Sequence, residues 1–141
     1  MLALVTGALI PIQAATNAAF SKAVGNSIVT GLSVFLIGLA GMVVYSLVVK
    51  TPLPTVKQLG EAPLYSYMGG LIIALYVVMI TILVPRIGVG TAIGLIVTGQ
   101  IIGAVLIDHF GLCHVIVRPL SAIRLTGVIL MIVGVYCVMR K

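Results

Sequence analysis

Charged residues are scarce in this sequence. Only 7% of its 141 residues are charged, just two of them are acidic, and 62% are hydrophobic. Soluble domains carry roughly 25% charged residues, so a water-soluble fold is excluded. A membrane-spanning helix needs roughly 20 mostly apolar residues, which leaves room for five such helices with short connections and for no extramembrane catalytic domain. The composition therefore predicts an all-α integral membrane protein.

Motifs that would indicate catalysis are missing. The sequence has no paired carboxylates, no nucleophile beside a base and no phosphate-binding glycine loop, so we do not expect an enzyme. The two cysteines, Cys113 and Cys137, form no disulfide framework. Metal-ligand residue types gather between Asp108 and His114, but their spacing fits no zinc pattern. We therefore expect no metal and no other cofactor.

Clustered basic charge is missing as well. The net charge is +6, but the eight Lys and Arg residues stand singly at the edges of apolar segments. Nucleic-acid-binding proteins gather such residues on one face, so we expect lipid headgroups and not nucleic acid as the partner. No basic region precedes the first apolar run, which predicts that this run is retained as a first helix.

Five apolar segments predict five transmembrane helices within a single membrane domain, residues 1–141. Their approximate ranges are 2–22, 27–49, 65–84, 88–107 and 121–139. Asn26 and Ser27 are typical of a helix start, and the prolines and glycine between Lys50 and Pro63 predict a polar loop without helix. The third helix is expected to stop at Pro85. An odd number of spans places the two termini on opposite sides of the membrane.

Basic residues divide equally between the two predicted sides of the membrane. One side has Lys50, Lys57, Arg118 and Arg124, and the other has Lys22, Arg86, Arg140 and Lys141. Because orientation follows the Lys and Arg bias of short loops, this chain has no preferred orientation by charge. Two oppositely inserted copies can pair as an inverted repeat, so we predict an antiparallel homodimer. The alternative is one orientation fixed by the insertion machinery or by a partner.

Two amide side chains mark the first segment. Gln13 and Asn17 are four residues apart and therefore share one helix face. An unpaired amide costs several kcal/mol in hydrocarbon, so both must face another helix or a water-filled cavity. Pro11 removes a backbone donor and predicts a helix break of the kind that lines substrate sites. We expect a cavity wall here, with interhelical hydrogen bonding as the alternative.

The fourth segment combines an amide with small residues. Gln100 lies in mid-span, where it is expected either to line the cavity or to bond to another helix. Gly99 and Gly103 have the spacing of a close helix contact and are candidates for packing or for the dimer interface. Tyr76, in the middle of the third segment, is expected to reach the cavity. The other tyrosines lie near span ends and are interpreted as interfacial anchors.

Asp108 is the single carboxylate near the membrane core. Any carboxylate-based ion coupling therefore depends on it. Its position at a helix end favours instead ordinary solvation or an ion pair with Arg118 or Arg124 from the next segment.

Four short motifs carry a family resemblance: Pro-Ile-Gln-Ala at 11–14, Pro-Arg-Ile-Gly at 85–88, Gly-Gln at 99–100 and Ile-Asp-His-Phe-Gly at 107–111. The first resembles the first half of the YdcZ-type exporters of the drug/metabolite transporter superfamily, and the other three resemble the second half. The resemblance covers essentially the full chain. It implies a five-helix half-transporter for small-molecule export in the inner membrane, with relatives found as single genes, as pairs of opposite orientation and as fused chains.

These observations favour a secondary transporter of small polar or zwitterionic solutes, in which two inverted copies alternate access. The small multidrug resistance relatives keep a glutamate in their first helix, whereas this chain has no acidic residue there. Proton-coupled cation export by that route is therefore not expected. The alternatives are a non-transporting membrane subunit that packs with a partner, and one half of a heterodimer with a sister chain.

Overall fold

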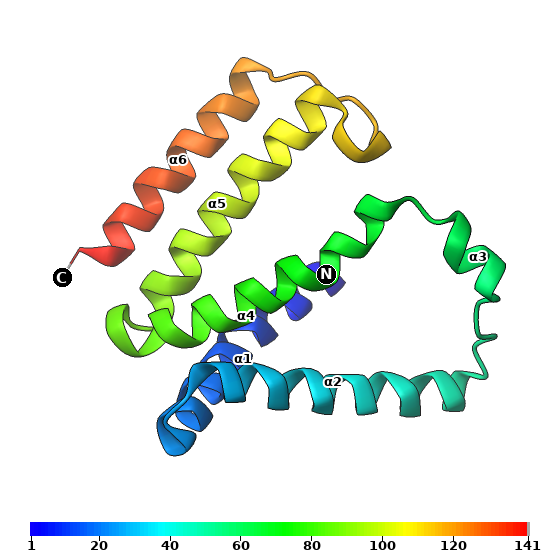
Figure 1. Cartoon of the computed structure of the whole chain (residues 1–141). Coiled ribbons are helices and arrows are strands. Elements are labelled where there is room, and N and C mark those ends of the chain that lie inside the picture. The colour runs from blue at the N-terminus through cyan, green and yellow to red at the C-terminus, as the bar shows by residue number, and fades with distance from the viewer. Residues whose placement is uncertain (141) are drawn as a thin grey trace. The chain divides into compact units, whose positions relative to one another are not determined.

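The computed structural model describes residues 1–140, and this part of the chain is helical without any strand. The helices follow one another as the rainbow colouring of Figure 1 shows. They are α1 (Leu2–Val24), α2 (Ser27–Val49), α3 (Val56–Glu61), the 3-10 helix η1 (Leu64–Tyr67), α4 (Met68–Ile87), α5 (Val89–Phe110), the 3-10 turn η2 (Leu112–His114) and α6 (Ala122–Met139).

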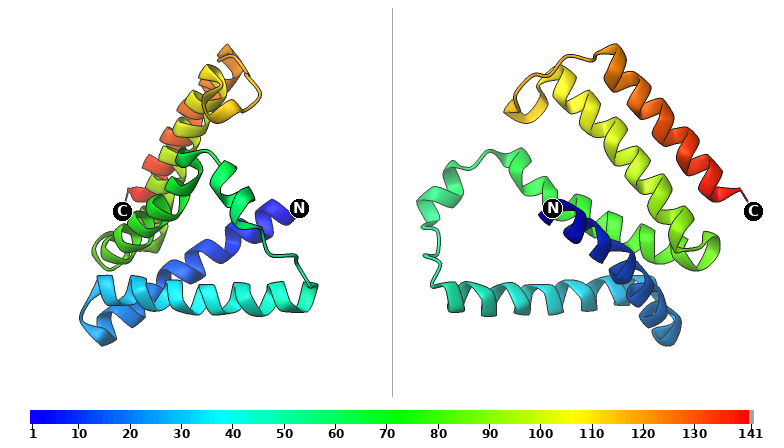
Figure 2. Two further views of the ribbon diagram at one scale, coloured as in Figure 1. Left: turned by 45° about the vertical axis from the view of Figure 1, so that its right-hand side comes forward. Right: turned by 180° about the vertical axis from the view of Figure 1, so that it is seen from behind.

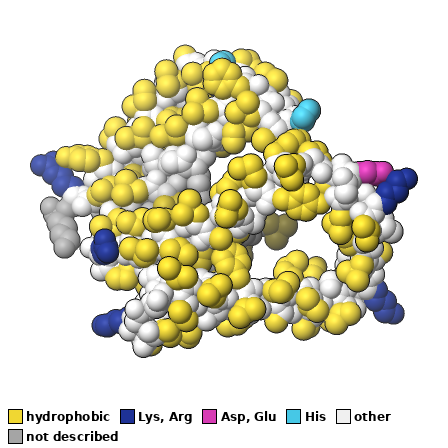
Figure 3. Space-filling model, viewed as in Figure 1, with side chains coloured by type: hydrophobic (Ala, Val, Ile, Leu, Met, Phe, Trp, Pro, Cys, Tyr) yellow, Lys and Arg dark blue, Asp and Glu magenta, His cyan; other side chains and the backbone are white. Residues whose placement is uncertain are grey.

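Five of these helices are long and apolar enough to cross a membrane: α1, α2, η1 with α4, α5 and α6. Most of their surface is uncovered, since α5 buries only Ala92 and α6 buries no residue at all. The uncovered side chains are mainly hydrophobic. Figure 3 shows hydrophobic side chains over most of the visible face, with the basic groups at helix ends and loops. Such a surface suits lipid and further protein contacts and does not suit water.

The chain forms two compact units, of which the first is Met1–Pro85. Within it, α1 and α2 pack against each other close to their connecting turn and diverge away from it, as Figure 2 shows. Gly25 ends α1 with a left-handed φ of 76°, and Asn26 caps α2 by accepting from the N–H groups of Ile28 and Val29. The helix start expected at Asn26 and Ser27 is confirmed.

The connection from α2 to α4 is not free of helix as expected. The short helix α3 occupies Val56–Glu61, and its first turn is held by a capping box in which Thr55 and Gln58 bond to each other's backbone N–H. The Tyr67 hydroxyl also donates to the Leu59 carbonyl oxygen at 2.6 Å. The prolines do not prevent this helix, because they precede and follow it and none lies inside it.

Two prolines also interrupt the helices less than expected. α1 continues through Pro11, so the helix break predicted there is wrong. α4 continues through Pro85 as far as Ile87, and the chain turns only at Gly88, whose φ of 83° is a value that favours glycine. A proline in a helix removes one hydrogen bond, and the rest of the helix retains its own bonds.

The second unit begins at Arg86 and consists mainly of α5 and α6. These two helices lie side by side as an antiparallel pair, which both Figure 1 and Figure 2 show. Gly94 permits the close approach, because a Cβ at this position would lie 3.2 Å from Cγ1 of Val135. α5 extends to Phe110 and therefore includes Asp108 and His109 in its last turn.

Hydroxyl groups inside the spans bond mainly to their own helices. Eight of them donate to a carbonyl oxygen three or four residues earlier, at distances of 2.7 to 3.0 Å: Thr6, Thr16, Thr30, Ser33, Ser46, Thr81, Thr98 and Thr126. Such bonds satisfy the hydroxyl proton in a medium that offers no water.

Candidate functional site

Most of the polar side chains that the structure buries lie in the first unit. Asn17 and Ser21 of α1, Thr30 of α2 and Thr81 of α4 are each at most 9% exposed. The residues around them on α1 are small, with Ala14 and Ala18 also buried. Sequence analysis identified Asn17 but missed the hydroxyls, because a single Ser or Thr in an apolar segment gives no signal of burial.

Hydrogen bonding separates Asn17 from its buried neighbours. The Ser21 hydroxyl lies 2.9 Å from that of Ser27 across the α1–α2 turn. Thr30 and Thr81 donate to the carbonyl oxygens of Asn26 and Val77. The Nδ2 nitrogen of Asn17, by contrast, has no acceptor among the described residues. Leaving a buried donor unpaired costs about 1 to 3 kcal/mol. The Asn17 amide therefore destabilises the fold unless a further molecule accepts a hydrogen bond from it.

The other cavity candidates of the first unit are less buried. Gln13 lies on the same helix one turn earlier than Asn17 but is exposed. Pro11 is partly buried, and so is Tyr76 in the middle of α4. The structure therefore separates Gln13 from Asn17: Asn17 belongs to the buried stripe of α1, and Gln13 lies just outside it.

The candidates on α5 face outward from the second unit. Gln100 is exposed, and a Cβ built on Gly99 or Gly103 would meet no atom within 4 Å. This stripe is thus open to a further helix. A separate shallow groove lies between α5 and α6 and is lined by Leu95, Thr98, Ile132, Val135, Tyr136 and Met139. Its side chains are mainly apolar, so it has few polar groups with which to bind a polar solute.

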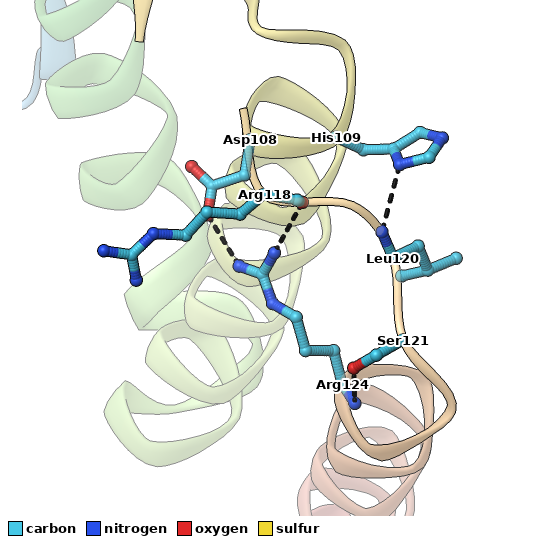
Figure 4. A network of polar contacts seen from close by, with 6 residues as sticks. All are labelled: Asp108, His109, Arg118, Leu120, Ser121 and Arg124. Carbon is cyan, nitrogen blue, oxygen red and sulfur yellow. Dashed lines mark hydrogen bonds and ion pairs between the residues drawn. The ribbon is translucent and has the colours of Figure 1, made fainter. Parts of the chain in front are cut away.

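Asp108 takes part in a network of polar contacts at the α5–α6 connection, drawn in Figure 4. Its Oδ2 atom lies 2.6 Å from Nη2 of Arg124, one of the two partners expected from sequence. Nη1 of the same guanidinium donates to the Arg118 carbonyl oxygen at 2.9 Å, and the Arg118 N–H donates to the Asp108 carbonyl oxygen at 2.8 Å. Arg124 therefore joins the end of α5 to the start of α6.

Two further bonds hold the same connection. The Leu120 N–H donates to Nδ1 of His109 at 3.0 Å, which requires that this ring nitrogen carries no proton. Ser121 caps α6 by accepting from the Arg124 N–H. Figure 4 shows these groups on one short stretch of chain. Together these bonds hold the loop between α5 and α6 in one conformation.

The Asp108–Arg124 pair is about one third exposed on both sides, at 32% and 31%. The contact between the two side chains is a short, charge-assisted hydrogen bond of 2.6 Å. Its geometry explains a structural role directly. Proton or cation coupling through Asp108 would first require that this pair opens.

Comparison with known proteins gives one match. The model of the family described as "Putative inner membrane exporter, YdcZ" matches residues 1–137. Neither the curated proteins nor the solved structures include a match. The match extends from α1 through most of α6 and so includes residues of both units, which agrees with the resemblance carried by the motifs at 11–14 and 107–111. The chain therefore belongs to the YdcZ family of inner membrane exporters and is a multi-pass protein of the inner membrane.

Proposed function

We propose that this protein is one half of a secondary transporter that exports small polar or zwitterionic solutes. Two copies in opposite orientations would enclose a polar cavity and expose it alternately to the two sides of the membrane. The cavity candidates are Gln13, Asn17, Gln100 and Tyr76. Membership in the exporter family and the five apolar helices support this proposal.

The observation that carries the proposal is the depth of two exposed amides. Gln13 is the central residue of α1, Leu2–Val24, and Gln100 lies at the centre of α5, Val89–Phe110. Both are exposed in the single chain. A helix of this length spans the bilayer, so its central residue lies near the midplane, where an amide facing lipid is costly. A second protein surface or a wetted cavity must therefore cover them.

An inverted second copy of the same chain would supply the surface that covers these two amides. The two orientations are equally favoured by basic charge, with four Lys or Arg residues on each side. The open stripe of Gly99 and Gly103 on α5 offers a surface on which another helix can pack closely. A sister chain of opposite orientation would satisfy the same needs, which makes a heterodimer the main alternative within the transporter class.

Solute flux in proteoliposomes tests the transport function. We expect purified protein to move a member of a panel of small polar and zwitterionic solutes under a proton or sodium gradient. Gln13→Ala and Gln100→Ala should lower the flux at least tenfold while the thermal unfolding temperature stays within a few degrees of wild type. Gly127→Ala on α6, where a Cβ meets no atom, is the matched control.

The opposite pattern would support a non-transporting subunit. In that case both glutamine variants would lower the unfolding temperature, and no solute of the panel would move. Orientation needs its own measurement. Tags on the two termini, scored for their side of the membrane, should appear on both sides if the protein pairs with itself, whereas a single fixed side rejects the antiparallel homodimer.

A further inference from the structure

The unpaired amide of Asn17 lies at a defined place in the first unit. Ser21 and Ser27 contact each other across the α1–α2 turn. One helical turn further from this contact lie Asn17 on α1 and Gly31 on α2, both buried. A Cβ on Gly31 would lie 3.3 Å from Cγ2 of Val78, which places α4 against α2 at the same level. Asn17 and the contact of α2 with α4 are therefore each one helical turn from the Ser21–Ser27 contact.

The buried polar groups of the first unit differ in whether their protons are already used in hydrogen bonds. Thr30 and Thr81, at 0% and 1% exposed, use their hydroxyl protons in bonds to their own helices. Their oxygens retain lone pairs and can only accept further bonds. Asn17 contributes an amide N–H2 that has no acceptor. The buried polar groups of the first unit therefore include one unpaired donor and two hydroxyl oxygens that can still accept.

No charge accompanies these groups. The buried residues in the described part of the chain include no Lys, Arg, Asp, Glu or His. A carboxylate or an ammonium group bound at Asn17 would be buried without a counter-charge, and an ammonium group has no acceptor for the amide N–H. An uncharged group with an acceptor oxygen, such as a hydroxyl or a carboxamide, can pair with the amide N–H without burying a charge.

We propose that Asn17 is the anchoring hydrogen-bond donor of a subsite for an uncharged hydroxyl or carboxamide group. That the group belongs to an exported solute rests on the proposed function; that the subsite binds such a group does not. The inference narrows the solute class, since a solute bound here presents a neutral hydrogen-bonding end to α1 and keeps any charge elsewhere.

Stability without ligand provides the first test. Asn17→Leu replaces the amide by an apolar group of similar size and removes the unpaired donor. We expect its unfolding temperature in lipid nanodiscs to equal or exceed that of wild type. Thr16→Val on the same helix is the matched control, because Thr16 already bonds to the carbonyl oxygens of Ile12 and Gln13 and is exposed. A marked fall in both Asn17→Leu and the smaller variant Asn17→Ala would mean that Asn17 already bonds to water or to a partner helix, and would overturn the proposal.

Binding of small probes provides the second test. Acetamide and ethylene glycol carry the neutral groups, and acetate and methylammonium carry the charged ones. The neutral probes should raise the wild-type unfolding temperature by ~2 °C or more relative to Asn17→Leu in the same solution, a comparison that cancels the general effect of the solvent. The charged probes should not. Equal shifts in both proteins, or a larger shift with acetate, contradict the proposal.

A second variant protects the test from a folding defect. Asn17→Ala also removes the donor and introduces the residue type that already flanks it at Ala14 and Ala18, so it should lose the probe response even if Asn17→Leu does not fold. Flux distinguishes the two proposals. Transport without a probe response at Asn17 retains the transporter and rejects the subsite, whereas a probe response without transport retains the subsite and rejects the transporter.

Discussion

The two units of the chain manage polar groups in opposite ways. The first unit, Met1–Pro85, buries an amide and three hydroxyls within its spans and has no charge among its buried residues. The second unit places its polar network at the end of the α5–α6 pair, where Asp108 and Arg124 are each about one third exposed. Neutral groups therefore lie inside the spans, and the ionised pair lies where water reaches it.

This difference follows from the cost of burial. A hydroxyl can satisfy its proton on its own helix, as Thr81 does at 2.7 Å from the Val77 carbonyl oxygen, but a carboxylate in hydrocarbon has no such local remedy. We infer that the second unit uses its charges to fix a connection and that the first unit provides the polar groups available for recognition. The following predictions test this comparison, beginning with the largest effect.

Gly111→Ala should destabilise the second unit most. Gly111 has a φ of 62°, and a Cβ there would lie 2.6 Å from Cγ2 of Val117. Left-handed backbone costs a non-glycine residue about 1 to 2 kcal/mol and the contact adds to it, so we expect a loss of about 2 kcal/mol in the free energy of unfolding. Denaturant titration in mixed micelles measures it. Gly127→Ala, in open space on α6, should be neutral or slightly stabilising; equal losses at both sites would show that the connection is not specially constrained.

The Asp108–Arg124 pair should contribute a smaller but measurable coupling. A double-mutant cycle with Asp108→Asn and Arg124→Gln should give about 1 to 2 kcal/mol, because the bond is charge-assisted and only partly exposed. The Lys57–Glu61 pair is the natural control, since its atoms are 3.9 Å apart and its side chains are 85% and 66% exposed. Its coupling should stay below about 0.5 kcal/mol. A coupling near zero at Asp108 would leave the carboxylate free for ion coupling and weaken the comparison.

The two helix caps should show the smallest effects, in a fixed order. Asn26 accepts from two N–H groups at 2.8 and 3.2 Å, whereas Ser121 accepts from one at 3.3 Å. We expect Asn26→Ala to cost about 1 kcal/mol and Ser121→Ala about 0.5 kcal/mol, both measured by the same titration. The reverse order would indicate that the α1–α2 turn depends on packing and the Ser21–Ser27 contact more than on its cap.

Sequence patterns predicted the helices well because apolar runs and caps are local signals. Asn26 and Ser27 start a helix as expected, and five spans are present. The helix at Val56–Glu61 was missed although its capping signal, Thr55 with Gln58, is present in the sequence. The prolines around it suggested a loop. The interruptions predicted at Pro11 and Pro85 were wrong because the neighbouring backbone bonds hold each helix together.

The candidate site was less predictable because burial depends on where helices approach each other. Gln13 and Asn17 share a helix face and an amide group, so periodicity cannot separate them. The structure separates them because the buried stripe of α1 comprises Ala14, Asn17, Ala18 and Ser21, and Gln13 lies just outside the edge of this stripe. Similarly, spacing gave Arg118 and Arg124 equal claims on Asp108. Arg124 forms the pair because the connection folds back through the Arg118 backbone.

The hydroxyls that bond to their own helices have a consequence for motion. Because groups such as Thr30, Thr81 and Thr98 use their protons within one helix, neighbouring helices are joined by shape and dispersion forces with few directional links. A change in how two such helices pack therefore breaks few hydrogen bonds between them. Each span retains these internal hydrogen bonds whatever its neighbours do.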